Sequence, residues 1–157
     1  MAYFLNAGYG EMTPFVEFAA EQFDRQFAVN VRGVLLHACL QVPLLKGGGT
    51  ILITTSIAEF VGIEKGLLYK ATKSALRTSA RVVAKELARR NIRVNCLSLG
   101  PIETNFMGGA GMNESGGRRP NVHFAITFNF HENRVVGCTD LSDNHRWHGT
   151  MVSATPG

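Results

Sequence analysis

Two residues that lie four apart on one predicted helix, Tyr69 and Lys73, have the types and the spacing needed to move a proton. Side chains at positions i and i+4 share one face of a helix. A phenol has a pKa near ~10 and is a poor base at neutral pH, but a neighbouring ammonium favours the phenolate and lowers that pKa. The pair is therefore predicted to work as a general acid and base. The competing interpretation is an amphipathic helix whose lysine stem packs along the surface.

Two further polar residues are candidates for the same chemistry. Ser56 follows a predicted buried strand and comes thirteen residues before Tyr69, where its hydroxyl can hydrogen-bond a substrate carbonyl oxygen. Asn30 falls within a predicted helix, where asparagine is unfavourable because its amide competes with the backbone hydrogen bonds. Both residues also have ordinary interpretations, since a loop serine commonly caps a turn and a helix asparagine commonly lies on the surface.

Residues 1–106 alternate strand-like and helix-like runs, which predicts the frame that positions these side chains. The apolar, strand-like runs are residues 3–5, 50–54 and 92–98, and the helical patterns cover about 14–41 and 67–90. Strands separated by helices of this length pair in parallel through right-handed crossovers. The sequence therefore predicts an α/β fold with about three parallel strands and two long helices. Its chemistry should gather where the strands end, at residues 6–10, 55–56 and 99–104.

Residues 107–157 have a different composition, with one leucine (Leu141), no lysine and several glycines. They are predicted to be an irregular, weakly patterned tail, and an unrelated fused segment or a shifted reading frame would explain the change. A metal site in this tail is the remote alternative, and its ligands would be His131, Cys138, His145 and His148. Their spacing fits no familiar zinc pattern, so no metal is predicted.

Taken together, these residues resemble the short-chain dehydrogenase/reductase (SDR) family. The matching segments, in chain order, are Asn6-Ala7-Gly8, Asn30-Val31-Arg32-Gly33, Ser56, Tyr69-Lys70-Ala71-Thr72-Lys73 and Leu99-Gly100-Pro101-Ile102-Glu103-Thr104. Their order and spacing agree with the family over residues 1–106, with Leu99 where the family usually has proline. The resemblance implies a partial Rossmann-type, doubly wound parallel sheet and NAD(P)-dependent interconversion of carbonyl and alcohol groups.

The resemblance also assigns roles to individual residues. Tyr69 would be the general acid/base, Lys73 would lower its pKa and bind the nicotinamide ribose, and Ser56 would hold the substrate oxygen. Asn30 would anchor a water in a proton relay behind Lys73. The residues that would line the NAD or NADP site are Asn6, Ala7, Gly8, Tyr69, Lys73, Gly100, Pro101, Ile102 and Thr104. The two long helices commonly form the subunit interface of the family, which implies a homo-oligomer.

The family's glycine-rich phosphate turn, Thr-Gly-x-x-x-Gly-x-Gly, has no counterpart before Asn6. Such a turn brings the backbone close to the pyrophosphate at a helix N-terminus. We therefore expect a truncated chain with impaired activity, whose first strand is an exposed apolar edge. The alternative is a non-catalytic fragment that acts only through its helical oligomer interface.

Composition narrows the remaining possibilities. The net charge is +4, but the lysines and arginines are scattered without interleaved aromatic residues, so no nucleic-acid partner is expected. No run approaches the ~18 consecutive apolar residues of a membrane span, and the N-terminus lacks the basic and apolar regions of a secretory signal. The three cysteines show no CxxC pair and are expected to be reduced thiols. The sequence thus predicts a cytoplasmic protein, and the resemblance implies a small-molecule carbonyl or alcohol substrate.

Overall fold

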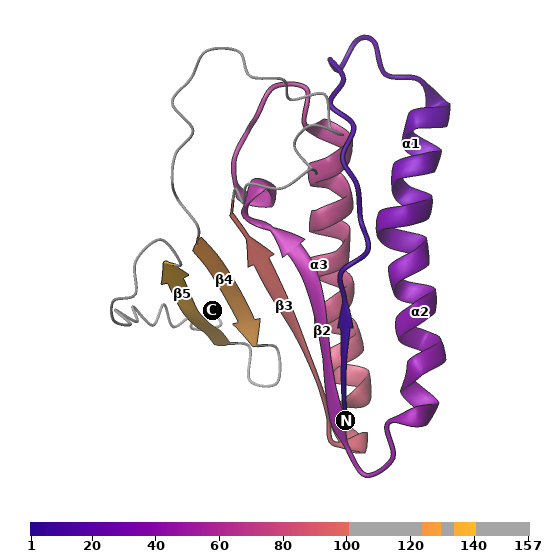
Figure 1. The fold of residues 1–157 in the computed structure, drawn as a ribbon, viewed down its shortest axis with the longest axis vertical. Coiled ribbons are helices and arrows are strands. Elements are labelled where there is room, and N and C mark those ends of the chain that lie inside the picture. Colours follow the sequence, from indigo (N-terminus) through magenta and orange to yellow (C-terminus); the bar gives the residue numbers. More distant parts are fainter. Residues whose placement is uncertain (101–123, 130–133, 141–157) are drawn as a thin grey trace.

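The computed structural model describes residues 1–100, 124–129 and 134–140, and these form one five-stranded sheet in the order β1-β2-β3-β4-β5 (Figure 1). Strands β1 (Ala2–Leu5), β2 (Gly49–Ser56) and β3 (Ile92–Leu99) are parallel. Strand β2 is the middle one of the three parallel strands, and its apolar, β-branched sequence suits a position between two neighbours. The predicted α/β class with three parallel strands is confirmed.

Two long helical segments cover one face of these parallel strands (Figure 1). The first runs through α1 (Ala20–Phe27), a π-helical turn (Ala28–Gly33) and α2 (Val34–Gln41). The second is α3 (Leu67–Leu87), which continues into a short 3-10 turn. Both helices were predicted from their apolar spacing.

The start of the first helix was predicted wrongly at Pro14. Pro14 instead opens an isolated turn, in which its carbonyl accepts a hydrogen bond from the Glu17 amide at 3.0 Å. The helix begins at Ala20, because the Gln22 side chain accepts a hydrogen bond from the Ala19 amide at 2.9 Å and caps the first turn.

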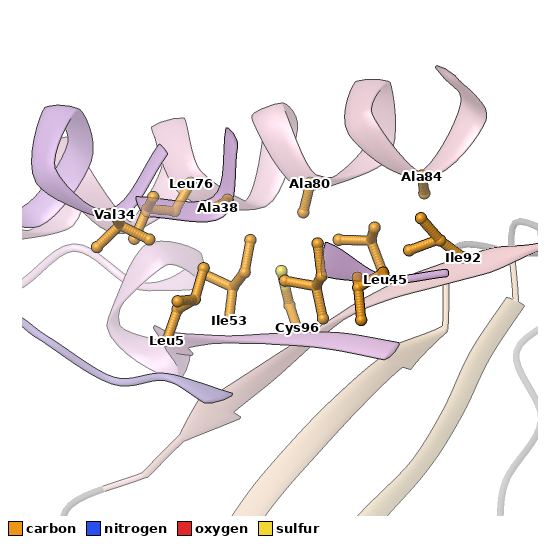
Figure 2. Packing of buried hydrophobic residues seen from close by; sticks show 12 residues of the cluster. Leu5, Val34, Ala38, Leu45, Ile53, Leu76, Ala80, Ala84, Ile92 and Cys96 are labelled. Carbon is orange, nitrogen blue, oxygen red and sulfur yellow. The ribbon is translucent and has the colours of Figure 1, made fainter. Parts of the chain in front are cut away.

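The hydrophobic core lies between the sheet and these helices (Figure 2). Alternate residues of β2, Ile51 and Ile53, point toward the helices and are fully buried, as the two-residue period of a strand requires. Ala80 and Ala84 on α3 are also buried, and their small side chains let the helix pack closely on β3. This packing fixes the position of α3 relative to the ends of the strands.

Among the described strands, β1 lies at one edge of the sheet. Phe4, which alternates with the buried Leu5, is 55% exposed. The other edge is extended by β4 (Phe124–Asn129), which pairs antiparallel with β3, and by β5 (Arg134–Asp140).

Strands β4 and β5 fall within the segment for which the sequence predicted no regular element. Phe124, Ile126 and Phe128 do alternate with smaller or polar residues, which is the period of a strand, but the surrounding glycines obscured it. Of the four residues considered as metal ligands, only Cys138 falls in a described strand. His131, His145 and His148 lie outside the described residues.

By length and composition alone, the continuous helical segment Ala20–Leu44 could cross a membrane. Core helices and signal sequences pass the same test, and 17% of the apolar window of this segment is buried. Two of its polar residues, Gln26 and Asn30, are fully buried and hydrogen-bonded to the loop after β1. These contacts connect the segment to that loop.

Candidate active site

The predicted site residues converge where the parallel strands end. Ser56 is the last residue of β2, Tyr69 and Lys73 lie in the first two turns of α3, and Asn30 lies in the π-helical turn before α2. The loop that contains Asn6 and Gly8 follows β1 directly. Six residues from four parts of the sequence thus come together at the carboxyl ends of the parallel strands.

Asn30 is fully buried, and its side chain holds the loop after β1 in place. The amide Nδ2 donates to the Tyr9 carbonyl at 2.8 Å, and Oδ1 accepts from the Tyr9 backbone amide at 2.9 Å. Nδ2 also donates to the Thr72 hydroxyl on α3 at 3.1 Å. The π-helical turn places Asn30 on the inner side of the helix, so the surface interpretation of this residue is excluded.

Lys73 is 3% exposed, and its ammonium points at the end of β2 rather than into solvent. Nζ donates to the Thr54 carbonyl at 3.0 Å and lies 5.7 Å from the centroid of the Tyr69 ring. Burial lowers the pKa of Lys73 to about 8, although the negative charge of Glu59 opposes that shift. The snorkelling-lysine interpretation therefore does not describe this residue.

The Ser56 hydroxyl lies close enough to the Tyr69 phenol to affect its pKa. Burial raises the pKa of the Tyr69 phenol, and the interaction with Ser56 opposes that rise. With the side chains as they lie here, the Lys73 ammonium points to the Thr54 carbonyl. A lowering of the Tyr69 pKa by Lys73 stays a prediction from the sequence.

The serine is held by its own backbone neighbours as well. Its Oγ accepts a hydrogen bond from the Ala58 amide at 3.2 Å and lies 3.4 Å from the Leu99 carbonyl oxygen. Ser56 therefore does cap a turn, as its ordinary interpretation held, but the same hydroxyl also contacts Tyr69. The two interpretations are compatible in this fold.

The loop after β1 approaches these side chains closely. A Cβ added to Gly8 would lie 3.3 Å from the Lys73 Nζ and 3.4 Å from the Asn30 Oδ1. Asn6 accepts a hydrogen bond from the Thr54 hydroxyl through its Oδ1 at 2.7 Å. Ala7 between them is exposed. The loop backbone is thus brought next to the lysine ammonium.

The last segment of the predicted site is described only at its start. Gly100 follows β3 at the same edge of the sheet, whereas Pro101, Ile102 and Thr104 lie outside the described residues. The positions of these three residues remain predictions from the resemblance.

Two polar residues of the site were missed by the sequence analysis. The Thr72 hydroxyl accepts from Asn30 and donates to the Tyr69 carbonyl at 2.7 Å. Gln26 donates to the Glu11 carbonyl at 2.9 Å and anchors the far end of the loop after β1. Thr72 is four residues from Leu68 and from Leu76, which share its buried helix face, and that position was the available signal.

The described residues fit one end of a nicotinamide cofactor. Gly8 leaves a backbone surface open beside a buried ammonium, and the hydroxyls of Tyr69 and Ser56 lie close together one helical turn away. A cation and hydroxyl donors at a strand-end edge suit a ribose and the oxygen of a reacting carbonyl. Among the described residues, no glycine-rich turn that could hold a pyrophosphate was found.

Comparison with known proteins identifies the family of the chain. Residues 2–123 match a family model described as enoyl-(acyl carrier protein) reductase, which covers more than half of the chain. The chain therefore belongs to the short-chain dehydrogenase/reductase family, as its motifs indicated.

Three curated relatives are similar to part of this chain. The chain is 38% identical to the NADPH-dependent aldehyde reductase 2, chloroplastic, of Arabidopsis thaliana over 93 residues, which are 57% of this chain and 34% of the relative. It is 38% identical to dehydrogenase/reductase SDR family member 4 of Sus scrofa, over 58% of this chain and 33% of the relative. It is 38% identical to the uncharacterized oxidoreductase YghA of Escherichia coli K12, over 56% and 30%. The matched part thus spans about a third of the length of these relatives.

Proposed function

We propose that the protein is an NAD(P)-dependent oxidoreductase that interconverts a carbonyl and an alcohol by hydride transfer. The observation that carries the proposal is the placement of Ser56 at the end of β2 beside Tyr69 on α3, with the buried Lys73 ammonium one helical turn further along the same helix. Membership of an oxidoreductase family supports the same reaction class.

Each side chain has a distinct task in this reaction. When bound, NAD or NADP supplies or accepts the hydride. Tyr69 donates its phenolic proton to the substrate oxygen during reduction and takes it back during oxidation. Ser56 donates a hydrogen bond to the same oxygen and so stabilises the charge that develops there.

Lys73 contributes a fixed positive charge beside the phenol. Because its pKa is about 8, the ammonium is charged at neutral pH and attracts the phenolate that forms when Tyr69 has given up its proton. Asn30 holds the loop backbone at Tyr9, so that Gly8 stays open next to Lys73. The buried position of both side chains limits the access of water to this proton pathway.

The experiment that tests the proposal is an assay of the purified chain with NADPH or NADH and a panel of carbonyl compounds. The Arabidopsis relative is named as an NADPH-dependent aldehyde reductase, so NADPH with aldehydes is the first pair to test. Turnover that is lost in Tyr69→Phe and kept in the matched control Tyr3→Phe would support the proposal. A folded chain that binds neither cofactor and shows no turnover would contradict it.

A second candidate function is association without catalysis, through the outer side of the first long helix. Large apolar side chains are exposed there, and they are Phe23, Val29, Leu36 and Leu40. A row of apolar side chains of this kind marks an interaction surface. Sedimentation of the chain should then show a homo-oligomer that Leu36→Glu and Leu40→Glu dissociate. Ile63→Glu, at an exposed apolar residue outside both long helices, should leave it intact.

A further inference from the structure

Glu59 is a buried carboxylate for which the proposed reaction has no task. It lies in the 3-10 turn Ile57–Phe60, three residues after Ser56, and its side chain is 2% exposed. Burying a charged carboxylate is unfavourable unless hydrogen bonds and counter-charges compensate it. The groups around Glu59 therefore indicate what it does in the fold.

A chain of hydrogen bonds connects Glu59 to the residue that precedes Ser56. The Ser98 hydroxyl on β3 donates to the Glu59 Oε1 at 3.2 Å. The oxygen of the same hydroxyl lies 2.6 Å from the Thr55 hydroxyl, and both of these side chains are buried. Thr55 and Ser98 are register partners in the sheet. The carboxylate thus connects the ends of β2 and β3 next to Ser56 through hydrogen bonds.

The same carboxylate also contacts α3. Its Oε1 lies 3.7 Å from the Arg77 Nη1, and the Arg77 guanidinium lies 4.6 Å from the centroid of the Phe60 ring. Arg77 follows Tyr69 by eight residues, about two helical turns, and so lies on the same helix face. Glu59 therefore joins the strand that ends in Ser56 to the helix that carries Tyr69.

We propose that Glu59 is a positioning residue that, through Ser98 and Thr55 on one side and Arg77 on the other, holds the Ser56 hydroxyl against the Tyr69 hydroxyl. The effect of Glu59 on catalysis rests on the proposed function. Its effect on the placement of Ser56 beside Tyr69 does not, because that placement is a property of the folded chain. Glu59 itself touches neither substrate nor cofactor.

A direct effect of charge has to be separated from this positioning effect. The charged and titratable groups around Glu59 are Arg77 and Arg81 on α3, Lys73 on the same helix and Cys96 on β3. Removing the carboxylate changes the field at Tyr69 whether or not Ser56 moves. A double-mutant cycle separates the two, since the field effect is the same with and without Ser56 and cancels in the difference.

The experiment measures the pKa of Tyr69 in the full chain by absorbance. Tyr3 and Tyr9 are replaced by phenylalanine, and Tyr69 is incorporated as the more acidic fluorotyrosine, so that the titration is complete before alkaline unfolding begins. The cycle compares Glu59→Ala with and without Ser56→Ala. We expect Glu59→Ala to raise the pKa about one unit more when Ser56 is present, which corresponds to the loss of one hydrogen bond to a charged group.

Further variants test the same chain of hydrogen bonds without removing the Glu59 side chain. Ser98→Ala interrupts the same chain and leaves the Glu59 charge in place, so it should show the same coupling to Ser56, and it decides the question where Glu59→Ala does not fold. Glu59→Gln keeps an oxygen that Ser98 can donate to and should show little coupling. The matched control is Glu11→Ala, which removes a carboxylate that is paired with Arg25 at 3.2 Å and should be additive with Ser56→Ala.

Additive pKa changes for both Glu59→Ala and Ser98→Ala would overturn the proposal. The titration needs no turnover, so a chain that transfers no hydride would contradict the proposed function and leave this result standing. Where turnover is measured, Glu59→Ala should lower kcat with little change in KM, because the substrate's other contacts are untouched.

Discussion

The Lys73 ammonium donates a hydrogen bond to the carbonyl oxygen of Thr54 at 3.0 Å, and this bond connects α3 to β2. Thr54 lies two residues before Ser56, so the bond also helps to fix the position of Tyr69 relative to the end of β2. The lysine is therefore held by the backbone of β2, whereas Tyr69 is held by Ser56. Proton transfer at this site depends on the relative positions of the Lys73 ammonium and the Tyr69 hydroxyl, which these two contacts fix.

Replacing Lys73 with methionine should change how stability depends on pH. The pKa of Lys73 is lowered from 10.5 to about 8 in the folded chain, so between these values the unfolded chain binds a proton that the folded chain does not. The free energy of unfolding of the parent, relative to Lys73→Met, should therefore rise with pH from about 8 to 10.5, by at most ~1.4 kcal/mol per pH unit. Below pH 8 the cost of the buried ammonium is complete, and above 10.5 it is absent.

Urea unfolding at a series of pH values measures this difference, and the contributions of titrating groups that do not interact with Lys73 cancel in it. The exposed Lys85→Met is the matched control and should show no such slope. A difference that stays flat or falls across this range would show that Lys73 is not a desolvated ammonium.

Gly8→Ala should weaken binding of a nicotinamide cofactor. The new methyl group would lie 3.3 Å from the Lys73 Nζ and 3.4 Å from the Asn30 Oδ1, so one of these side chains has to move. We expect at least a tenfold rise in the dissociation constant measured by calorimetry, about 1.4 kcal/mol. Gly62→Ala is the control, because a Cβ at that position meets nothing within 4 Å. Equal affinities of the two variants would contradict the close approach.

Asn30→Ala should destabilise the fold more than an ordinary helix substitution. The change leaves the Tyr9 amide, the Tyr9 carbonyl and the Thr72 hydroxyl without the partner that they have now. Each buried polar group that loses its partner costs about 1–3 kcal/mol, so the free energy of unfolding should fall by about 3 kcal/mol or more. Gln41→Ala, on the exposed end of α2, should change it by less than about 0.5 kcal/mol.

Chemical denaturation measures both variants under one set of conditions. A loss for Asn30→Ala no larger than that for Gln41→Ala would mean that the loop after β1 does not depend on Asn30.

The sequence could predict the parallel strands and both long helices because apolar periodicity reports burial directly. Ile51 and Ile53 alternate in a strand, and Leu68, Thr72 and Leu76 recur at helical spacing. The spacing therefore predicts which face of each element is buried. The beginning of the first helix was not predictable in this way. It depends on the Gln22 side chain capping the Ala19 amide, a contact that apolar periodicity does not encode.

The sequence could predict which residues form the site, but not how their side chains interact. The motif spacing brought Ser56, Tyr69 and Lys73 together, and the structure places all three at one edge. The direction of the Tyr69 pKa was not predictable, because it depends on how far burial outweighs neighbouring charge. Glu59 escaped notice for a related reason, since a glutamate in a short turn is usually exposed.

Ser56→Ala should impair the reaction and shift its pH dependence at the same time. Loss of the hydroxyl removes the interaction that lowers the pKa of Tyr69, so the alkaline limb of the rate profile that follows the phenol should move to higher pH. It also removes one donor to the substrate oxygen, for which we expect about a hundredfold loss in kcat. The exposed Ser74→Ala on α3 should keep the parent profile. A slower enzyme whose limb does not move would mean that Ser56 contacts the substrate alone and leaves Tyr69 unaffected.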